Sequence, residues 1–272
     1  MGESVKRVLF VNSEIFPYLP ESEIANIGRY LPQGIQERKK EIRSFMPRYG
    51  CINERKNQLH EVIRLSGMNI IINDVDRPLV IKVASISAAR MQVYFIDNED
   101  YFHRKSVYCD ENGEFFKDNG ERAIFFARGV LETMKKLRWA PDIIHCHGWI
   151  SHILPPYLKK CYIDDPIFSN SKVVLSFYDD TPTTDFPADL KEKMLFGGVS
   201  ESDVEIMTEP TGINLAKLAA TYADGIILGS DKVSEEIVDH CRKAGLPILE
   251  YRAGSIEDGS YIEDYNSFYD NL

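Results

Sequence analysis

Hydrophobic residues along the chain fall into two kinds of segment, short continuous apolar runs and longer stretches with helical spacing. Residues 7–11 form an apolar run that ends in polar residues, which is typical of a buried parallel strand. Residues 24–35 place isoleucine and leucine at helical spacing around Pro32, which should bend or interrupt that helix. Residues 41–46 predict a second strand, which Pro47 closes. The chain therefore opens with a strand, a helix and a strand.

The segment from residue 59 to residue 97 has a different pattern, because apolar runs follow one another with turn residues between them. Strands are predicted at residues 60–65, 68–72, 79–86 and 91–96. This spacing predicts a meander or hairpins rather than strands separated by helices. A long helix with one apolar face follows at residues 119–138.

The second half of the chain returns to strands separated by helices. Strands are predicted at residues 141–147, 172–177, 225–228 and 246–249. Helices are predicted at residues 149–160 and 214–222, and Pro155 and Pro156 are expected to interrupt the first of them. A further helix is predicted from a cap at Ser230 to about residue 244. Strands that alternate with helices at this spacing predict an α/β fold with a doubly wound parallel sheet.

The last nineteen residues differ in composition from the rest. We expect residues 1–253 to form one domain and residues 254–272 to form an acidic aromatic tail. Its acidic residues face no basic residue within the tail, and aromatic residues lie between them. We expect a partly ordered tail whose aromatic side chains tuck back onto the domain, because chain ends are often loosely held, and a docking segment for a partner is the alternative. The tail is therefore predicted to be dispensable for folding.

Charge and composition exclude several classes of protein. The formal net charge of −10 argues against nucleic-acid binding, which favours a basic face. Apolar runs of strand length predict no membrane span and no signal peptide. The opening Met1-Gly2 fits a myristoylation signal only superficially. Five widely spaced cysteines without a CxxC pair indicate reduced thiols, so we expect a cytoplasmic protein.

Five stretches carry sequence motifs: residues 8–17 (VLFVNSEIFP), 45–50 (FMPRYG), 101–122 (from YFHR to ER), 141–149 (PDIIHCHGW) and 212–224 (GINLAK to YAD). In order and spacing they resemble the glycosyltransferase family 5 pattern of glycogen and starch synthases. The resemblance implies a Rossmann-like domain that is one half of the two-domain GT-B fold, with the active site between the two domains. It implies that this half receives the growing α-1,4-glucan and that the other half holds most of the sugar nucleotide.

Positions that touch ligand in the family depart from its pattern in this chain. A lysine-threonine-glycine-glycine loop that grips the ADP-glucose phosphates in the family is here a degenerate phosphate loop, made of Pro20, Glu21, Ser22 and Glu23. Two carboxylates in this loop would repel a diphosphate. Gly148 stands where the family has the aspartate of an HDW motif, and Tyr178-Asp179 stand where it has a histidine-asparagine pair.

The resemblance implies a protein of the glucosyltransferase class, which transfers glucose from ADP-glucose to α-1,4-glucan. The resemblance covers half of such an enzyme, so we expect the chain to be incomplete or inactive alone and to need a partner chain that carries the missing domain. The alternative is a non-catalytic glucan-binding, regulatory or scaffold domain that partners a glycosyltransferase, and the lost phosphate loop favours it. The expected ligand is α-glucan or sugar nucleotide, and no cofactor is expected.

The candidate substrate-binding residues are Trp149, His147, Arg104, Tyr178 and Asp179. Trp149 follows a strand whose carboxyl end faces the ligand crevice of an open α/β sheet, so its ring is either a platform for a sugar or a packed core residue. His145 and His147 alternate along that strand and should share one face, with one buried and one in the cleft. A third ligand is missing nearby, so no metal is expected. No catalytic acid or base is assigned.

Overall fold

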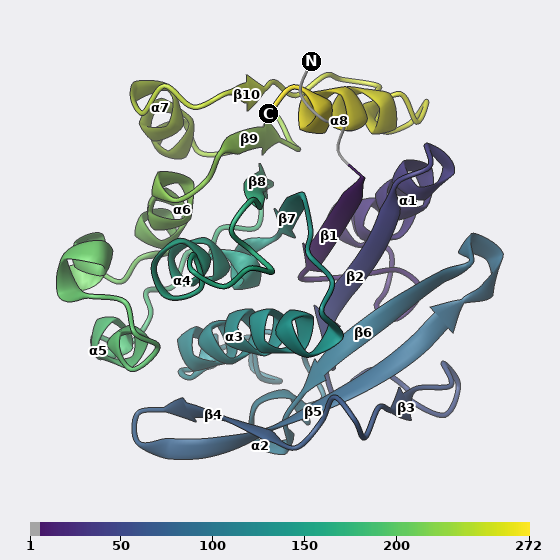
Figure 1. Ribbon diagram of the computed structural model, residues 1–272. Helices are drawn as coiled ribbons and strands as arrows, with labels where there is room; N and C mark the ends of the chain where they lie inside the picture. Colours follow the sequence, from purple (N-terminus) through teal and green to yellow (C-terminus); the bar gives the residue numbers. More distant parts are fainter. Residues whose placement is uncertain (1–5) are drawn as a thin grey trace.

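The chain folds around one large mixed sheet, seen in a computed structural model that describes residues 6–272 (Figure 1). In chain order its strands are β1 (Arg7–Asn12), β2 (Glu41–Pro47), β3 (His60–Glu61), β4 (Met68–Ile72), β5 (Val75–Ile86), β6 (Met91–Asp97), β7 (Ile143–His147), β8 (Lys172–Phe177), β9 (Gly225–Leu228) and β10 (Ile248–Leu249). Their order across the sheet is β10-β9-β8-β7-β1-β2-β6-β5-β3, and β4 pairs with β5. The expectation for the Met1-Gly2 start lies outside the described residues.

The sheet is doubly wound, as the sequence predicts. Strand β1 pairs in parallel with β2 on one side and with β7 on the other, so the chain winds outward from β1 in both directions. Strand β5 pairs antiparallel with β4 and with β6, which confirms the predicted hairpins. Strand β6 also pairs in parallel with β2, so one strand of a hairpin belongs to the parallel part of the sheet. Ligands of open α/β sheets sit where the winding direction changes, which is here the crevice between β1 and β7.

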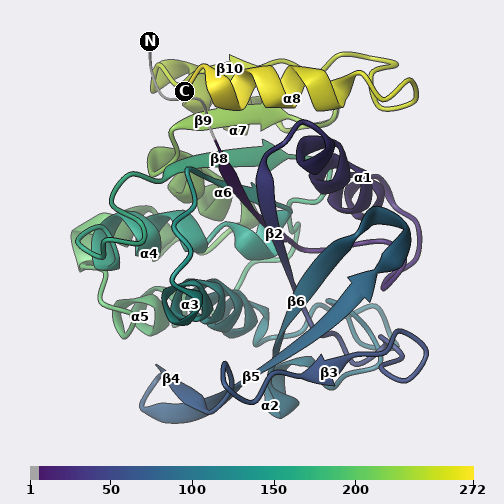
Figure 2. The same cartoon turned by 45° about the vertical axis from the view of Figure 1, so that its right-hand side comes forward.

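Helices cover both faces of the sheet (Figure 2). They are α1 (Glu23–Glu37), α2 (Glu99–Phe102), α3 (Asn119–Leu137), α4 (Leu154–Cys161), α5 (Leu190–Leu195), α6 (Gly212–Thr221), α7 (Glu235–Lys243) and α8 (Tyr261–Asp270), with 3-10 turns η1 (Ser87–Ala89), η2 (Trp149–Ser151) and η3 (Glu201–Thr208). Apolar residues of α1 and α8 form one buried cluster with the sheet, and those of α3, α4, α6 and α7 belong to the other. No helix within residues 6–272 is long and apolar enough to cross a membrane.

Three predicted helix features were wrong in detail, each for a local reason. Helix α1 runs through Pro32 without a break, because burial of Ile27, Leu31 and their neighbours outweighs the one backbone bond that proline removes. Pro155 and Pro156 lie in the first turn of α4, where no N–H group is needed, so they begin the helix rather than interrupt it. Helix α7 begins after Ser234 and not at Ser230.

The acidic aromatic tail is a structural helix, which contradicts the expectation that it is dispensable. Tyr261, Tyr265 and Tyr269 of α8 are 5%, 5% and 1% exposed, in the cluster that α8 shares with α1. The acidic residues of α8 do find cations, because Glu263 pairs with Arg38 and Asp270 pairs with Lys40 across more than 200 residues of sequence. The aromatic residues therefore tuck back onto the domain as predicted, but as part of its core.

Candidate functional site

The carboxyl ends of β1, β7 and β8 meet at one edge of the sheet, because these strands are parallel neighbours. Asn12 pairs in register with His147, and His147 pairs with Ser176. The segments that follow these strands begin at Ser13, Gly148 and Tyr178. The residues singled out by the sequence after β7 and β8 therefore do lie together at the crevice edge.

A pocket of about 590 Å³ opens at this edge, between the segment after β8 and the first turns of α6 and α7. Tyr178 and Asp179, two of the predicted substrate-binding residues, line it. Its neutral polar lining is Thr181, Thr183, Thr211, Asn214 and Ser234, and its charged lining is Asp179, Asp185, Glu209, Lys232 and Glu236. Such a lining offers donors and acceptors for hydroxyl groups.

The pocket has an excess of negative charge. Its carboxylates outnumber its one cation, Lys232, and Glu236 is paired with Lys217 from outside the lining. Asp179, Asp185 and Glu209 pair with no cation within residues 6–272. An anionic ligand group would be repelled here, whereas a neutral hydroxyl would find acceptors.

The Trp149 ring is packed on its sides by other aromatic rings. It is 3% exposed, and its centroid lies 4.9 Å from that of Tyr108 and 5.7 Å from those of Phe115 and Phe186. A sugar would have to open this cluster before it could stack on the indole. Trp149 therefore packs in the core and does not face the pocket.

The two histidines of β7 share one face, as predicted, but both are buried. The ring centroids of His145 and His147 are 3.8 Å apart and both residues are 0% exposed, so the expected cleft histidine lies in the interior. His147 Nδ1 lies 3.0 Å from the Tyr178 hydroxyl, and His145 lies 2.5 Å from that of Tyr269. Burial lowers the pKa of His147 to about 3, so the ring is neutral. Residues 6–272 contain no group of three or more His, Cys, Asp or Glu that could hold a metal ion.

Tyr178 connects the buried histidines to the pocket. Its ring lies against the backbone of Gly229, where a Cβ would come within 2.2 Å of the ring, so only glycine leaves room for it. The residue is 2% exposed, while its neighbour Asp179 is exposed. Asp179 is therefore the part of this pair that a ligand would meet first.

The predicted arginine is not part of the pocket. Arg104 donates from Nη1 to Asp118 over 2.6 Å, and its guanidinium lies 4.5 Å from the centroid of the Phe116 ring. Arg104 therefore packs within the segment between β6 and α3 and does not line the pocket. The buried Arg122 likewise donates to the carbonyl oxygens of Tyr101 and Val107, over 2.8 and 2.7 Å. It therefore holds the backbone of that segment in place.

The degenerate phosphate loop places carboxylates at the N-terminus of α1. Ser22 caps the helix, because its Oγ accepts from the N–H of Ala25 over 3.0 Å, and it donates to Glu14 over 2.8 Å. Glu23 adds a carboxylate in the first turn, and Pro20 and Glu21 are exposed beside it. Burial raises the pKa of Glu14. The positive end of the helix dipole is thus complemented by the chain itself, and a phosphate there would meet negative charge.

A second carboxylate of the segment after β8, that of Asp180, stands beside Gly148. Gly148 has φ of +82°, and a Cβ on it would lie 2.1 Å from Ser13 Oγ and 3.2 Å from Asp180 Oδ2. Asp180 accepts the N–H of Trp149 over 2.8 Å, and burial raises the pKa of this carboxyl to about 6. The sequence signal was the pair of aspartates after β8, which is equally typical of a turn. The segment after β8 thus places a carboxylate beside Gly148, where the family resemblance implies an aspartate.

Two buried polar atoms at the ends of β1 and β7 lack a partner. Ser13 Oγ and His147 Nε2 are buried and have no hydrogen-bond partner within the part of the chain that the structure describes. Buried polar groups are normally paired, so unpaired ones at a crevice are available to a ligand or to water. The edge therefore combines an open acidic pocket with buried hydrogen-bonding groups.

Comparisons with known proteins point to one family. The family model described as starch synthase catalytic domain matches residues 7–248. The glycogen synthase of Chlorobium limicola is 36% identical over 233 residues, which are 85% of this chain and 47% of that protein. The glycogen synthase of Chlorobium luteolum is 34% identical over 240 residues, which are 86% of this chain and 48% of that protein.

The fold is also similar to a solved structure. The catalytic domain of starch synthase IV from Arabidopsis thaliana, bound to ADP and acarbose, superposes with a TM-score of 0.66 at 15% identity. The match covers 83% of this chain and 45% of that one. The chain thus spans about half the length of the curated relatives and of the solved structure that it matches.

Proposed function

The chain belongs to the starch synthase catalytic domain family, and from this premise we propose that it is the glucan-binding half of a glucosyltransferase. The pocket at the carboxyl edge of β8 carries the proposal. Its hydroxyl, amide and carboxylate groups suit the hydroxyls of an α-1,4-glucan, and its unpaired Asp179, Asp185 and Glu209 disfavour a diphosphate. The ligand of this half is therefore a neutral glucan.

Sugar nucleotide is proposed to bind elsewhere in the assembled enzyme. Glu14, Glu21 and Glu23 surround the N-terminus of α1, where a phosphate would need cations or free N–H groups. A second domain or a partner chain would have to supply the site for ADP-glucose. A cytoplasmic location stays a prediction that goes with this substrate class.

Transfer by these 272 residues alone is therefore not expected. Purified chain is incubated with ADP-glucose and glycogen, and release of ADP is followed. The proposal predicts no turnover above background. Release at about 1 per second, within the ordinary range for enzymes, would show that one half suffices.

The pocket itself is tested with neutral oligosaccharide. Asp179→Ala and Asp185→Ala each remove a hydrogen-bond acceptor, and the affinity for maltoheptaose measured by calorimetry should weaken about tenfold, or about 1.4 kcal/mol. Asp164→Ala is the matched control, because Asp164 is exposed and does not line the pocket. Equal affinity in all three variants would remove the pocket from the proposal.

A second function is favoured by one observation, the carboxylates of the degenerate phosphate loop. A chain that binds glucan and rejects sugar nucleotide could serve as a non-catalytic glucan-binding or scaffold domain for a partner glycosyltransferase. Mixing the chain with a separately expressed C-terminal half of a related synthase distinguishes the two functions. Restored ADP release supports the catalytic half, and glucan binding without ADP release supports the scaffold.

A further inference from the structure

Buried polar side chains connect helix α8 to the pocket at the carboxyl edge. On one side, the Tyr269 hydroxyl lies 2.5 Å from His145 Nδ1, and His145 Nε2 lies 2.7 Å from Ser176 Oγ. On the other side, the Tyr178 hydroxyl lies 3.0 Å from His147 Nδ1. These two arms combine groups from α8, from the neighbouring strands β7 and β8, and from the segment that follows β8.

Tyr265, one turn before Tyr269 on α8, joins the two arms. Burial raises the pKa of Tyr265, and side-chain hydrogen bonds with Tyr178 and Ser176 oppose that rise. Burial and the neighbouring Tyr265 raise the pKa of Tyr178, whereas a hydrogen bond with Ser176 lowers it. The three hydroxyls therefore meet. We call the connected side chains the hydroxyl network: His145, His147, Ser176, Tyr178, Tyr265 and Tyr269.

The hydroxyl network is closed to solvent, since none of its residues is more than 5% exposed. A buried polar group that loses its partner keeps the cost of desolvation without the gain of the hydrogen bond. Each side chain of the network is thus held in place by its neighbours. Removal of one hydroxyl leaves another buried group unpaired and disturbs the next.

The hydrogen bonds at the α8 end of the network have a definite direction. Burial lowers the pKa of His145 well below its ordinary value, so its neutral ring has one donor and one acceptor nitrogen. Within residues 6–272 the Tyr269 hydroxyl makes its side-chain hydrogen bond with His145, so its proton goes to Nδ1. Nε2 then carries the ring proton and donates it to Ser176 Oγ. The tautomer of His145 therefore reports on the contact with Tyr269.

Tyr178 is the point at which the network reaches the pocket. Its ring lines the pocket and lies against the backbone of Gly229. Asp179, the next residue, is exposed and lines the same pocket. Because the two residues share a peptide bond, the place of the buried tyrosine sets the place of the exposed aspartate.

Helix α8 supplies this anchor from outside the residues that match the family. The family model covers residues 7–248, and α8 spans Tyr261–Asp270. The helix packs beside α1 and β10, in the buried cluster that it shares with α1 (Figure 2). The family pattern therefore does not account for the contact between α8 and the pocket.

We propose that Tyr265 and Tyr269 are positioning residues for the pocket at the carboxyl edge. Their hydroxyls hold Tyr178 through the network, and Tyr178 sets the place from which Asp179 accepts a hydroxyl of the ligand. The identity of that ligand rests on the proposed function, whereas the coupling of α8 to the pocket does not.

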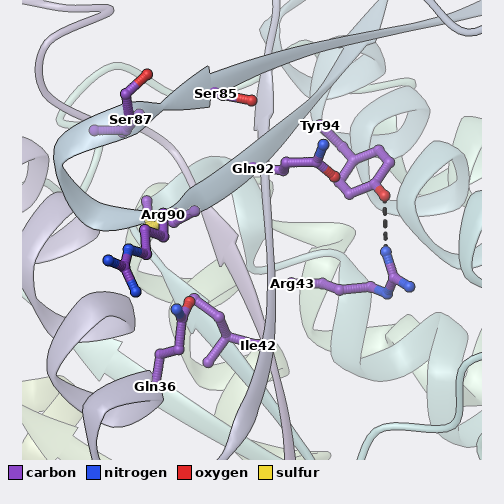
Figure 3. Close-up of a pocket in the computed structure, with 10 residues that line it drawn as sticks. Gln36, Ile42, Arg43, Ser85, Ser87, Arg90, Gln92 and Tyr94 are labelled. Atoms are coloured by element: carbon purple, nitrogen blue, oxygen red, sulfur yellow. Dashed lines mark hydrogen bonds between the residues drawn. The ribbon is translucent and has the colours of Figure 1, made fainter.

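A tyrosine at the opposite edge of the sheet provides a matched control. The Tyr94 hydroxyl accepts from Arg43 Nη1 over 2.7 Å, and Tyr94 is 7% exposed (Figure 3). Both residues line a pocket of about 430 Å³ at the amino ends of β2 and β6, together with the exposed Arg90. Tyr94→Phe thus removes a tyrosine hydroxyl from a hydrogen bond, as the test variants do, but away from the carboxyl edge.

Signals of the full labelled chain without ligand test the coupling. Tyr265→Phe and Tyr269→Phe should shift the backbone amide signal of Asp179. Tyr94→Phe should leave that signal in place. Long-range proton–nitrogen spectra should show His145 with its proton on Nε2, and Tyr269→Phe should move the Nδ1 signal because that nitrogen loses its donor.

The affinity for maltoheptaose, measured by calorimetry, tests whether ligand binding depends on this anchor. It should weaken about fivefold in Tyr265→Phe, which contacts Tyr178, as expected when one ordering hydrogen bond is lost. The loss should be smaller in Tyr269→Phe, which acts through His145. Tyr94→Phe should stay within about twofold of the unaltered chain.

The outcomes separate the coupling from the glucan function. Shifts at Asp179 without any binding of maltoheptaose by the unaltered chain would refute the glucan function and support the coupling. An Asp179 signal that moves equally in all the variants, or in none, would overturn the proposal, as would an unchanged maltoheptaose affinity in Tyr265→Phe. A His145 ring protonated on Nδ1 would remove Tyr269 from it, because the tyrosine proton would then have no acceptor.

Discussion

At the scale of single residues, two neighbouring positions of the motif after β7 differ in what they contact. Trp149 keeps its identity and lies in an aromatic cluster. Gly148 stands where the family resemblance implies an aspartate, and the space of its missing Cβ is taken by Ser13 Oγ, so an aspartate would not fit there without a shift of the serine. Asp180, in the segment after β8, brings a carboxylate to the same place.

Trp149→Ala should destabilise the protein by about 3–5 kcal/mol, the usual cost of truncating a buried large aromatic. Trp149→Phe keeps most of the packing and should cost less. Denaturant unfolding of both variants gives the loss, and calorimetry with maltoheptaose gives the affinity of whatever remains folded. A stable Ala variant that has lost glucan binding would show instead that the ring is a sugar platform.

The Asp180 carboxyl makes stability depend on pH between its ordinary pKa of 3.8 and its folded pKa of about 6. Since the folded state binds this proton more tightly, stability should fall as pH rises through that interval. Asp180→Asn cannot ionise, so its free energy of unfolding relative to the unaltered chain should rise from pH 4 to pH 6 and then level off. Denaturant titrations at several pH values measure the difference, and a difference that does not vary with pH would contradict the raised pKa.

At the scale of elements, the sequence predicts best those segments whose pattern is local. Residues 68–72, 172–177 and 225–228 are predicted as strands and coincide with β4, β8 and β9. Residues 190–208, which form α5 and η3, show no clear periodicity and were not predicted. The packing of α8 in the core could not be predicted from its own sequence either, because the surfaces that bury its tyrosines come from β1, β7 and α1, far away in sequence.

The same limit applies to the candidate site. Tyr178 and Asp179 could be placed at the pocket, because position after a parallel strand is enough to predict the edge. The burial of Trp149 could not be predicted, because the rings that cover it, Phe115 and Phe186, belong to separate loops. The proximity of Asp180 to Gly148 could not be predicted either, because it depends on the path of the chain after β8.

Removal of α8 by truncation after Arg252 should abolish cooperative folding or lower the melting temperature severely. Each of its three buried tyrosines would cost about 3–5 kcal/mol if deleted, and the sum reaches the whole stability of a typical domain. Tyr269→Phe is the milder companion, because it removes only the hydroxyl that lies against His145 and should cost about 1 kcal/mol. Thermal unfolding followed by circular dichroism measures both, and an unchanged melting temperature of the truncated chain would mean that α8 is not part of the core.

At the scale of the whole molecule, charge is distributed so that the two ends of the sheet differ. The carboxyl edge gathers carboxylates that pair with no cation among residues 6–272 around a pocket of about 590 Å³, and Glu14, Glu21 and Glu23 add to them at the start of α1. The amino edge instead has Arg43 and Arg90, and no carboxylate lines the pocket there. The two ends of the sheet therefore present charge of opposite sign.

The carboxyl edge is proposed to take neutral glucan and not sugar nucleotide. Backbone amide chemical shifts of the labelled chain, recorded during titration with maltoheptaose and separately with ADP-glucose, test it most directly. Maltoheptaose is predicted to shift signals of Asp179, Thr183 and Asn214 in a saturable way, and ADP-glucose is predicted to leave them in place. Saturable shifts of these residues by ADP-glucose, or none by maltoheptaose, would contradict the account.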